Sequence, residues 1–151
     1  MPVISRSRTV PAAPERVWSV VSDPAQLTEW WPGVQRVEDA SRKAWTTVLL
    51  TPKGRTLRAD FTLLDSEHPS LLRWRQEVEE SPFERILESA VTEVELQPAA
   101  DGATEVKLTQ RLTLRGFSRL GGMQIRMATR GVLQGALDGL GELADGWRAE
   151  S

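Results

Sequence analysis

Between about Leu120 and Trp147, apolar residues recur at the period of an α-helix. Wound as a helix, this stretch gathers on one face Ile125, Val132, Leu133, Ala136, Leu137, Leu140, Leu143, Ala144 and Trp147. The opposite face carries Arg130, Gln134, Asp138, Glu142 and Asp145. Such a helix is about 40 Å long, which exceeds an ordinary globular helix. Its apolar face needs a large partner surface, and this need constrains the rest of the fold.

The same stretch is rich in glycine, although each glycine costs about 1 kcal/mol relative to alanine in a helix interior. The glycines are Gly121, Gly122, Gly131, Gly135, Gly139, Gly141 and Gly146. Two explanations are open: they allow close packing or are neutral at the surface, or they leave room between the helix and its partner. A membrane dimer through Gly131, Gly135 and Gly139 is disfavoured, because charged residues recur every few positions.

Composition excludes several classes of function. The chain of 151 residues most simply forms one domain, residues 1–151, that can bury a substantial core. With 19 basic and 21 acidic residues and no basic cluster, no nucleic-acid partner is expected. The absence of cysteine excludes disulfides and thiolate nucleophiles, and a single histidine argues against a zinc site. We expect neither a metal nor a cofactor.

No apolar run has the length of a signal peptide or of a membrane span. We therefore expect a soluble, cytoplasmic protein without an integral membrane segment.

The N-terminal third predicts one strand and two short helices. Alternation over Val3–Val10 predicts a polar strand at a sheet edge or with one wet face. Pro14 suits the first position of a short helix, where its missing N–H is harmless. Asp23-Pro24 repeats this start signal for a second short helix to about Trp30, which Pro32-Gly33 ends.

Downstream the apolar residues alternate with the period of strands. The expected strands span residues 34–40, 45–51, 55–65, 72–78, 86–96 and 106–114. A strand, two short helices, about six further strands and one long helix predict an α+β fold with an antiparallel sheet. A sheet that long curls, and wrapped around the helix it can leave an apolar cavity of the type that binds small molecules.

Several motifs carry a resemblance to a known family. They are Val10-Pro11-Ala12-Ala13-Pro14-Glu15-Arg16-Val17-Trp18, Asp23-Pro24, Glu29-Trp30-Trp31-Pro32-Gly33-Val34, Leu96-Gln97-Pro98 and Asp101-Gly102-Ala103-Thr104-Glu105-Val106. Over nearly the whole chain the sequence resembles the START-like helix-grip superfamily, and within it the bacterial polyketide cyclase/dehydrase and lipid-transport branch. The resemblance implies about seven antiparallel strands gripping the C-terminal helix, with two short helices between the first two strands.

What the resemblance implies about function is broad. Members bind sterols, lipids, quinones, hormones or polyketides, and include aromatase/cyclases, ligand carriers and chaperone partners. The matched motifs are architectural, and none of them transfers a catalytic residue to this chain.

Two glutamines and one glutamate fall on the inward face of the expected strands: Gln76, Gln110 and Glu88. They could hydrogen-bond the polar end of an apolar ligand, or they could satisfy one another. Glu88, as an inward carboxylate, is the one candidate for a catalytic acid. The alternative is that the register is off by one, or that a bulge turns Glu88 out to solvent. His68, beside Pro69 in an expected turn, is interpreted as a solvated loop residue.

Three functional hypotheses follow. The first is a carrier of a small hydrophobic ligand, the second a cyclase/dehydratase that uses Glu88, and the third an interaction module with a collapsed cavity. The scarcity of catalytic residue types favours the first, in a monomer or homodimer. The expected ligand-binding residues are Trp74, Gln76, Phe61, Leu72, Glu88, Gln110, Trp30, Trp45, Val132 and Leu133. Trp31 is a further candidate for the cavity wall.

Overall fold

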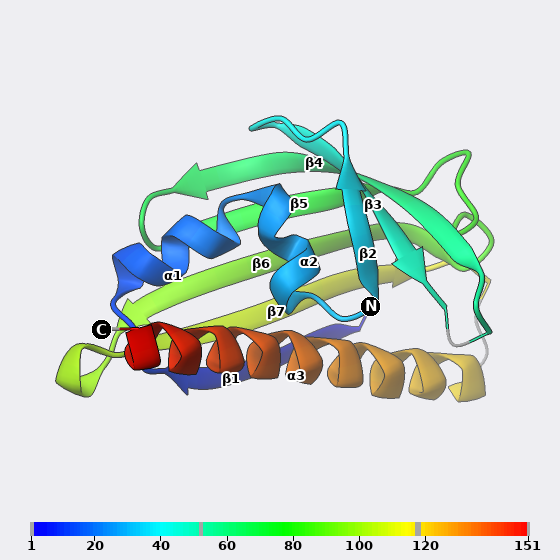
Figure 1. The fold of residues 1–151 in the computed structure, drawn as a ribbon. Helices are drawn as coiled ribbons and strands as arrows, with labels where there is room; N and C mark the ends of the chain where they lie inside the picture. Colours follow the sequence, from blue (N-terminus) through cyan, green and yellow to red (C-terminus); the bar gives the residue numbers. More distant parts are fainter. Residues whose placement is uncertain (1, 52, 117–118, 151) are drawn as a thin grey trace.

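A computed structural model describes residues 2–51, 53–116 and 119–150 of the chain. In chain order the elements are β1 (Val3–Val10), α1 (Pro14–Val21), the 3-10 helix η1 (Pro24–Gln26), α2 (Leu27–Trp30), β2 (Val34–Glu38), β3 (Ala44–Leu50), β4 (Thr56–Glu67), β5 (Leu71–Glu77), β6 (Leu87–Pro98), the 3-10 helix η2 (Ala100–Gly102), β7 (Thr104–Leu114) and α3 (Arg119–Glu150). This order and the curved sheet confirm the expected α+β helix-grip fold (Figure 1).

The seven strands form one antiparallel sheet in the order β1-β7-β6-β5-β4-β3-β2. The first two strands of the sequence are therefore the two edges of the sheet, and the edge position expected for β1 is confirmed. The segment with α1, η1 and α2 connects these edges and lies on the same side of the sheet as α3 (Figure 1).

Local sequence explains where the short elements begin and turn. Pro14 occupies the first turn of α1, as expected. The second expected helix divides into η1 and α2, and the Asp23 carboxylate caps η1 by accepting a hydrogen bond from the Ala25 backbone N–H at 3.1 Å. Between β6 and β7, Asp101 and Gly102 take φ values of 59° and 73°, the left-handed conformation that these residue types tolerate.

The apolar face of α3 forms the centre of the core, as its periodicity predicts. Leu133, Ala136, Leu137, Leu140 and Ala144 are completely buried. The polar residues expected on the opposite face are all exposed: Arg130, Gln134, Asp138, Glu142 and Asp145. Among the described residues, none of the helices has both the length and the apolar character that crossing a bilayer requires.

Four of the glycines of α3 fall into two groups. A Cβ at Gly135 would come within 2.8 Å of Pro32 Cγ, and Gly139 faces the backbone of Trp30. By contrast, a Cβ added at Gly131 or Gly146 would meet no atom within 4 Å among the described residues. Close packing therefore explains the first pair and surface neutrality the second, and the chain that follows α2 lies directly on α3.

Candidate functional site

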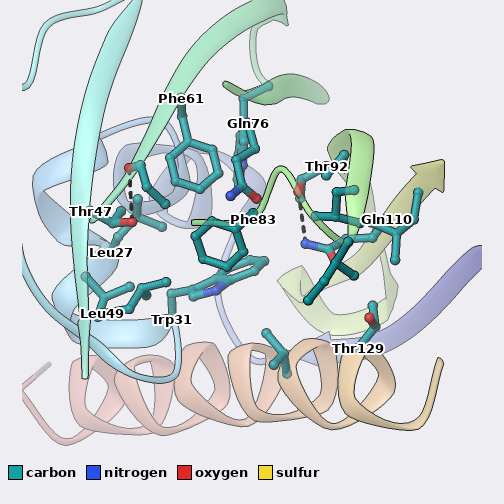
Figure 2. Close-up of a pocket in the computed structure, with 18 of the residues that line it drawn as sticks. Leu27, Trp31, Thr47, Leu49, Phe61, Gln76, Phe83, Thr92, Gln110 and Thr129 are labelled. Atoms are coloured by element: carbon teal, nitrogen blue, oxygen red, sulfur yellow. Dashed lines mark hydrogen bonds between the residues drawn. The ribbon is translucent and has the colours of Figure 1, made fainter. Parts of the chain in front are cut away.

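A pocket of about 230 Å³ lies between the sheet and α3 (Figure 2). Strands β2 to β7, α2, the segment before β6 and α3 all contribute side chains to it. The apolar residues that line it are Leu27, Trp31, Val34, Trp45, Leu49, Ala59, Phe61, Trp74, Phe83, Ile86, Leu87, Ala90, Leu112, Ile125 and Val132. The polar ones are Thr47, Gln76, Thr92, Gln110 and Thr129. Within the described part of the chain, no aspartate, glutamate, lysine, arginine or histidine lines the pocket.

A run of aromatic rings, all of which except the core residue Trp30 line the pocket, builds one of its walls. The ring centroids are 5.4 Å apart for Trp30 and Trp31, 6.2 Å for Trp31 and Trp74, and 5.8 Å for Trp74 and Trp45. Trp45 and Phe61, which are cross-strand partners on β3 and β4, stack with centroids 5.9 Å apart. Each pair has a separation at which aromatic rings attract one another, so contacts between neighbouring rings stabilise this wall.

Two glutamines face the pocket, and they differ in their hydrogen bonding. Gln110 on β7 donates through Nε2 to Thr92 Oγ1 on β6 at 3.1 Å, and these two residues are direct cross-strand partners. Gln76 on β5 is the cross-strand partner of Phe61, and its Nε2 is buried without a hydrogen-bond partner in the described structure. The Trp45 Nε1 is buried and unpaired in the same way. Figure 2 shows the Gln76 amide pointing into the pocket between Phe61 and Thr92.

Several of the residues expected to bind ligand meet at this pocket. Those that line it are Trp45, Phe61, Trp74, Gln76, Gln110 and Val132. Leu72 instead lines a second pocket of about 20 Å³. Trp30 and Leu133 are core residues, exposed by 3% and 0%, and are not among the lining residues.

The expected inward orientation of Glu88 is wrong. Leu87 and Ala90 are both buried although three positions separate them, and the pairing of β6 with β7 shifts register between Leu87 and Ser89. This bulge inserts one residue, so Glu88 is exposed and lies outside the pocket lining. The alternative in which a bulge turns Glu88 out to solvent is confirmed.

Some lining residues escaped the sequence analysis. Thr47 and Leu49 share the strand phase of Trp45, so alternation could have found them. Thr129 precedes Leu133 by one helical turn, which places both on one side of α3. Phe83 follows the break at Ser81-Pro82 in a segment without regular structure, where no periodicity exists to predict its direction.

The single histidine of the sequence lies outside the pocket lining. His68 is exposed, its Nε2 lies 2.9 Å from Glu15 Oε2, and its ring meets the edge of Trp18 with centroids 5.3 Å apart. It is not a lining residue, as expected of a loop histidine.

Charged side chains of the sheet pair with one another outside the pocket. A hydrogen bond from Thr62 Oγ1 at 2.7 Å, together with Arg75, lowers the pKa of Glu77. Hydrogen bonds from Arg36 and Arg58 likewise lower the pKa of Glu38. None of these residues lines the pocket, so the described structure separates its paired charges from the apolar interior.

Solved structures with this fold share little sequence with the chain. The protein XoxI from Bacillus cereus is 15% identical, with a TM-score of 0.75 and 95% of each chain covered. A START superfamily protein from Mycobacterium smegmatis is 11% identical, with a TM-score of 0.77, over 96% of this chain and 98% of that one. The di-domain ARO/CYC BexL from the BE-7585A biosynthetic pathway is 16% identical, with a TM-score of 0.77, over 94% of this chain and 46% of its own. At these identities the likeness shows the fold alone.

A search among curated proteins finds no match. The family model described as polyketide cyclase / dehydrase and lipid transport, however, matches residues 1–145. With its helix-grip fold, the chain belongs to this polyketide cyclase/dehydrase and lipid-transport family.

Proposed function

We propose that this protein binds and carries a small, largely apolar, uncharged molecule in the pocket between the sheet and α3. The observation that carries this proposal is the composition of the lining, in which 15 apolar residues accompany 5 polar and uncharged ones. A charged ligand would lose its hydration there without gaining a counter-charge from any described lining residue. An apolar ligand has no such hydration of a charge to lose, and its burial is favourable in proportion to the apolar surface area that leaves water.

The volume of the pocket limits the size of the ligand. An apolar protein cavity of about 150 Å³ accommodates benzene. The pocket of about 230 Å³ is half as large again, so it suits a molecule of one or two rings. A four-ring sterol or a long acyl chain would require the pocket to enlarge.

Catalysis of the cyclase or dehydratase kind is the second candidate, favoured by the family description. Acid–base catalysis uses a titratable side chain within hydrogen-bond reach of the reacting group. No described lining residue is an acid, a lysine or a histidine, and Glu88 is exposed. We therefore rank carriage ahead of catalysis.

The test is to extract the protein purified from its own host and to identify co-purifying compounds by mass spectrometry. In Val132→Trp the larger side chain enters the pocket from α3, and the compound should be lost. Ala128→Trp, at an exposed position of the same helix, is the matched control and should retain it. A compound held equally by both variants, or a wild-type protein that holds no compound and binds no one- or two-ring probe, would contradict the proposal.

A further inference from the structure

We propose that the ligand carries an uncharged hydrogen-bond acceptor, such as a carbonyl oxygen, and that Gln76 is the residue that recognises it. This inference rests on the proposed function, since it names the class of molecule that the same pocket holds.

The first step is the unpaired amide. Gln76 is half-buried, its Nε2 is buried without a partner among the described residues, and the amide points into the pocket (Figure 2). Most buried side-chain polar groups have a hydrogen-bond partner, so an exception at a pocket wall needs an explanation. Phe61, its cross-strand partner, offers no such group. A ligand atom would supply the missing partner.

The second step identifies which kind of atom is missing. Besides Gln76 Nε2, the lining contains a second unpaired buried donor, the Nε1 of Trp45. Trp30 Nε1 is unpaired as well, but Trp30 does not line the pocket. An indole N–H can only donate, so Trp45 requires an acceptor whichever way the Gln76 amide is turned, and the Gln76 Nε2 shares this requirement in the orientation that the structure shows. The other glutamine of the pocket, Gln110, already donates to Thr92.

The third step fixes the charge and shape of the acceptor. A carboxylate or phosphate would also accept hydrogen bonds, but no described lining residue carries the positive charge that would stabilise it. The wall formed by Trp31, Trp45, Trp74 and Phe61 matches a flat ring system. Together with the volume of about 230 Å³, these features select a neutral carbonyl compound of one or two rings.

The experiment compares three bicyclic probes by titration calorimetry on the full-length chain. They are 1-tetralone, tetralin, which lacks only the carbonyl oxygen, and 1-naphthoate, which carries a negative charge. The readout is the ratio of the 1-tetralone affinity to the tetralin affinity. Comparing this ratio between variants cancels the difference in hydration of the two probes.

In Gln76→Leu the ratio should fall by about three- to tenfold, the range expected for one lost neutral hydrogen bond. Tetralin affinity should stay within about twofold, because leucine preserves the bulk of the side chain. Gln97→Leu, at an exposed position of β6, is the matched control and should leave the ratio unchanged. If Gln76→Leu does not fold, Gln76→Met provides the same deletion with a more adaptable side chain.

The outcomes separate the two proposals. Both probes binding with the same ratio in Gln76→Leu and in wild type would overturn recognition by Gln76 while leaving the apolar pocket function intact. Preferential binding of 1-naphthoate would overturn the requirement for a neutral acceptor. If none of the three probes binds the wild-type protein, this inference fails, and the proposed function fails with it when no compound co-purifies with the protein either.

Discussion

Gly139 on α3 lies so close to α2 that a Cβ at position 139 would be 2.5 Å from the carbonyl oxygen of Trp30. Real Cβ atoms essentially never approach a neighbour this closely, and the neighbour is backbone rather than a flexible side chain. The glycine therefore permits the contact between α2 and α3. Because Trp31 directly follows α2 and lines the pocket, the same contact positions one wall of the candidate site.

In Gly139→Ala, overpacking should cost about 1–3 kcal/mol of the free energy of unfolding. Alanine gains about 1 kcal/mol over glycine in a helix interior, so we expect a net loss of up to about 2 kcal/mol. Gly131→Ala is the matched control, because no atom of the described part of the chain lies within 4 Å of its added Cβ. It should stabilise the protein by up to about 1 kcal/mol. Urea denaturation measures the free energy of unfolding of both variants. Equal changes in the same direction would refute the close contact between Gly139 and Trp30.

Gln76→Leu should raise the stability of the ligand-free protein. The wild-type amide nitrogen is buried without a partner among the described residues, and removing such a group relieves a cost of about 1–3 kcal/mol. Thermal unfolding of ligand-free protein is the measurement, and Gln97→Leu at its exposed position should change stability by less than about 0.5 kcal/mol. A destabilised Gln76→Leu protein would show that the amide is satisfied in solution.

The hydrogen bond between Gln110 and Thr92 should appear as a coupling energy. A double-mutant cycle of Thr92→Val and Gln110→Leu isolates this interaction, because each change removes one partner. We expect a coupling of about 0.5–1.5 kcal/mol from urea unfolding of the four proteins. Additive effects within error would mean that the two side chains do not bond.

The acid sensitivity of the protein should depend in part on Glu77. The Thr62 hydroxyl and Arg75 lower its folded pKa below the ordinary value of 4.5. A carboxylate with a depressed folded pKa stabilises the protein above the unfolded pKa, and this contribution is lost as the pH falls through the folded value. Glu77→Gln should therefore lose less stability than wild type between pH 6 and about pH 3.

The size of this effect should be only a few tenths of a kcal/mol, because the Glu77 side chain is 44% exposed and solvent screens its interactions. Chemical denaturation at a series of pH values is the measurement. Glu79→Gln, at an exposed position two residues along, is the control. If the free energies of unfolding of wild type and Glu77→Gln fall in parallel as the pH is lowered, the prediction is contradicted.

The sequence predicts those parts of the structure in which the apolar pattern repeats without interruption. The buried face of α3 follows from helical spacing, and the inward positions of Phe61, Gln76 and Gln110 follow from strand alternation, because backbone geometry repeats in both. Prediction ends where the repeat is interrupted. At Glu88 a single inserted residue reverses the phase, and no residue type in that stretch indicates a bulge.

The same limit applies to two other parts of the site. Phe83 lies on a segment with no repeat from which its direction could be derived. Trp30 and Trp31 are adjacent, and only the end of α2 decides that Trp31 lines the pocket while Trp30 enters the core. The Pro32-Gly33 break predicts where α2 ends. The direction in which each of the two rings points depends instead on tertiary contacts, here with Gly139, which no short-range pattern encodes.

Sequence periodicity predicts the direction of neither Phe83 nor Glu88, and their substitution tests which of them belongs to the site. Phe83→Ala removes a ring from the pocket wall, so 1-tetralone should bind roughly five- to tenfold more weakly, corresponding to about 1 kcal/mol of lost apolar contact. Glu88→Gln should change the affinity by less than about twofold and should leave its pH dependence unaltered, since the bulge turns this side chain to solvent. Titration calorimetry at two pH values measures both effects. Weaker binding in Glu88→Gln than in Phe83→Ala would show that the carboxylate reaches the ligand, and would restore it as a candidate acid for the enzymatic alternative.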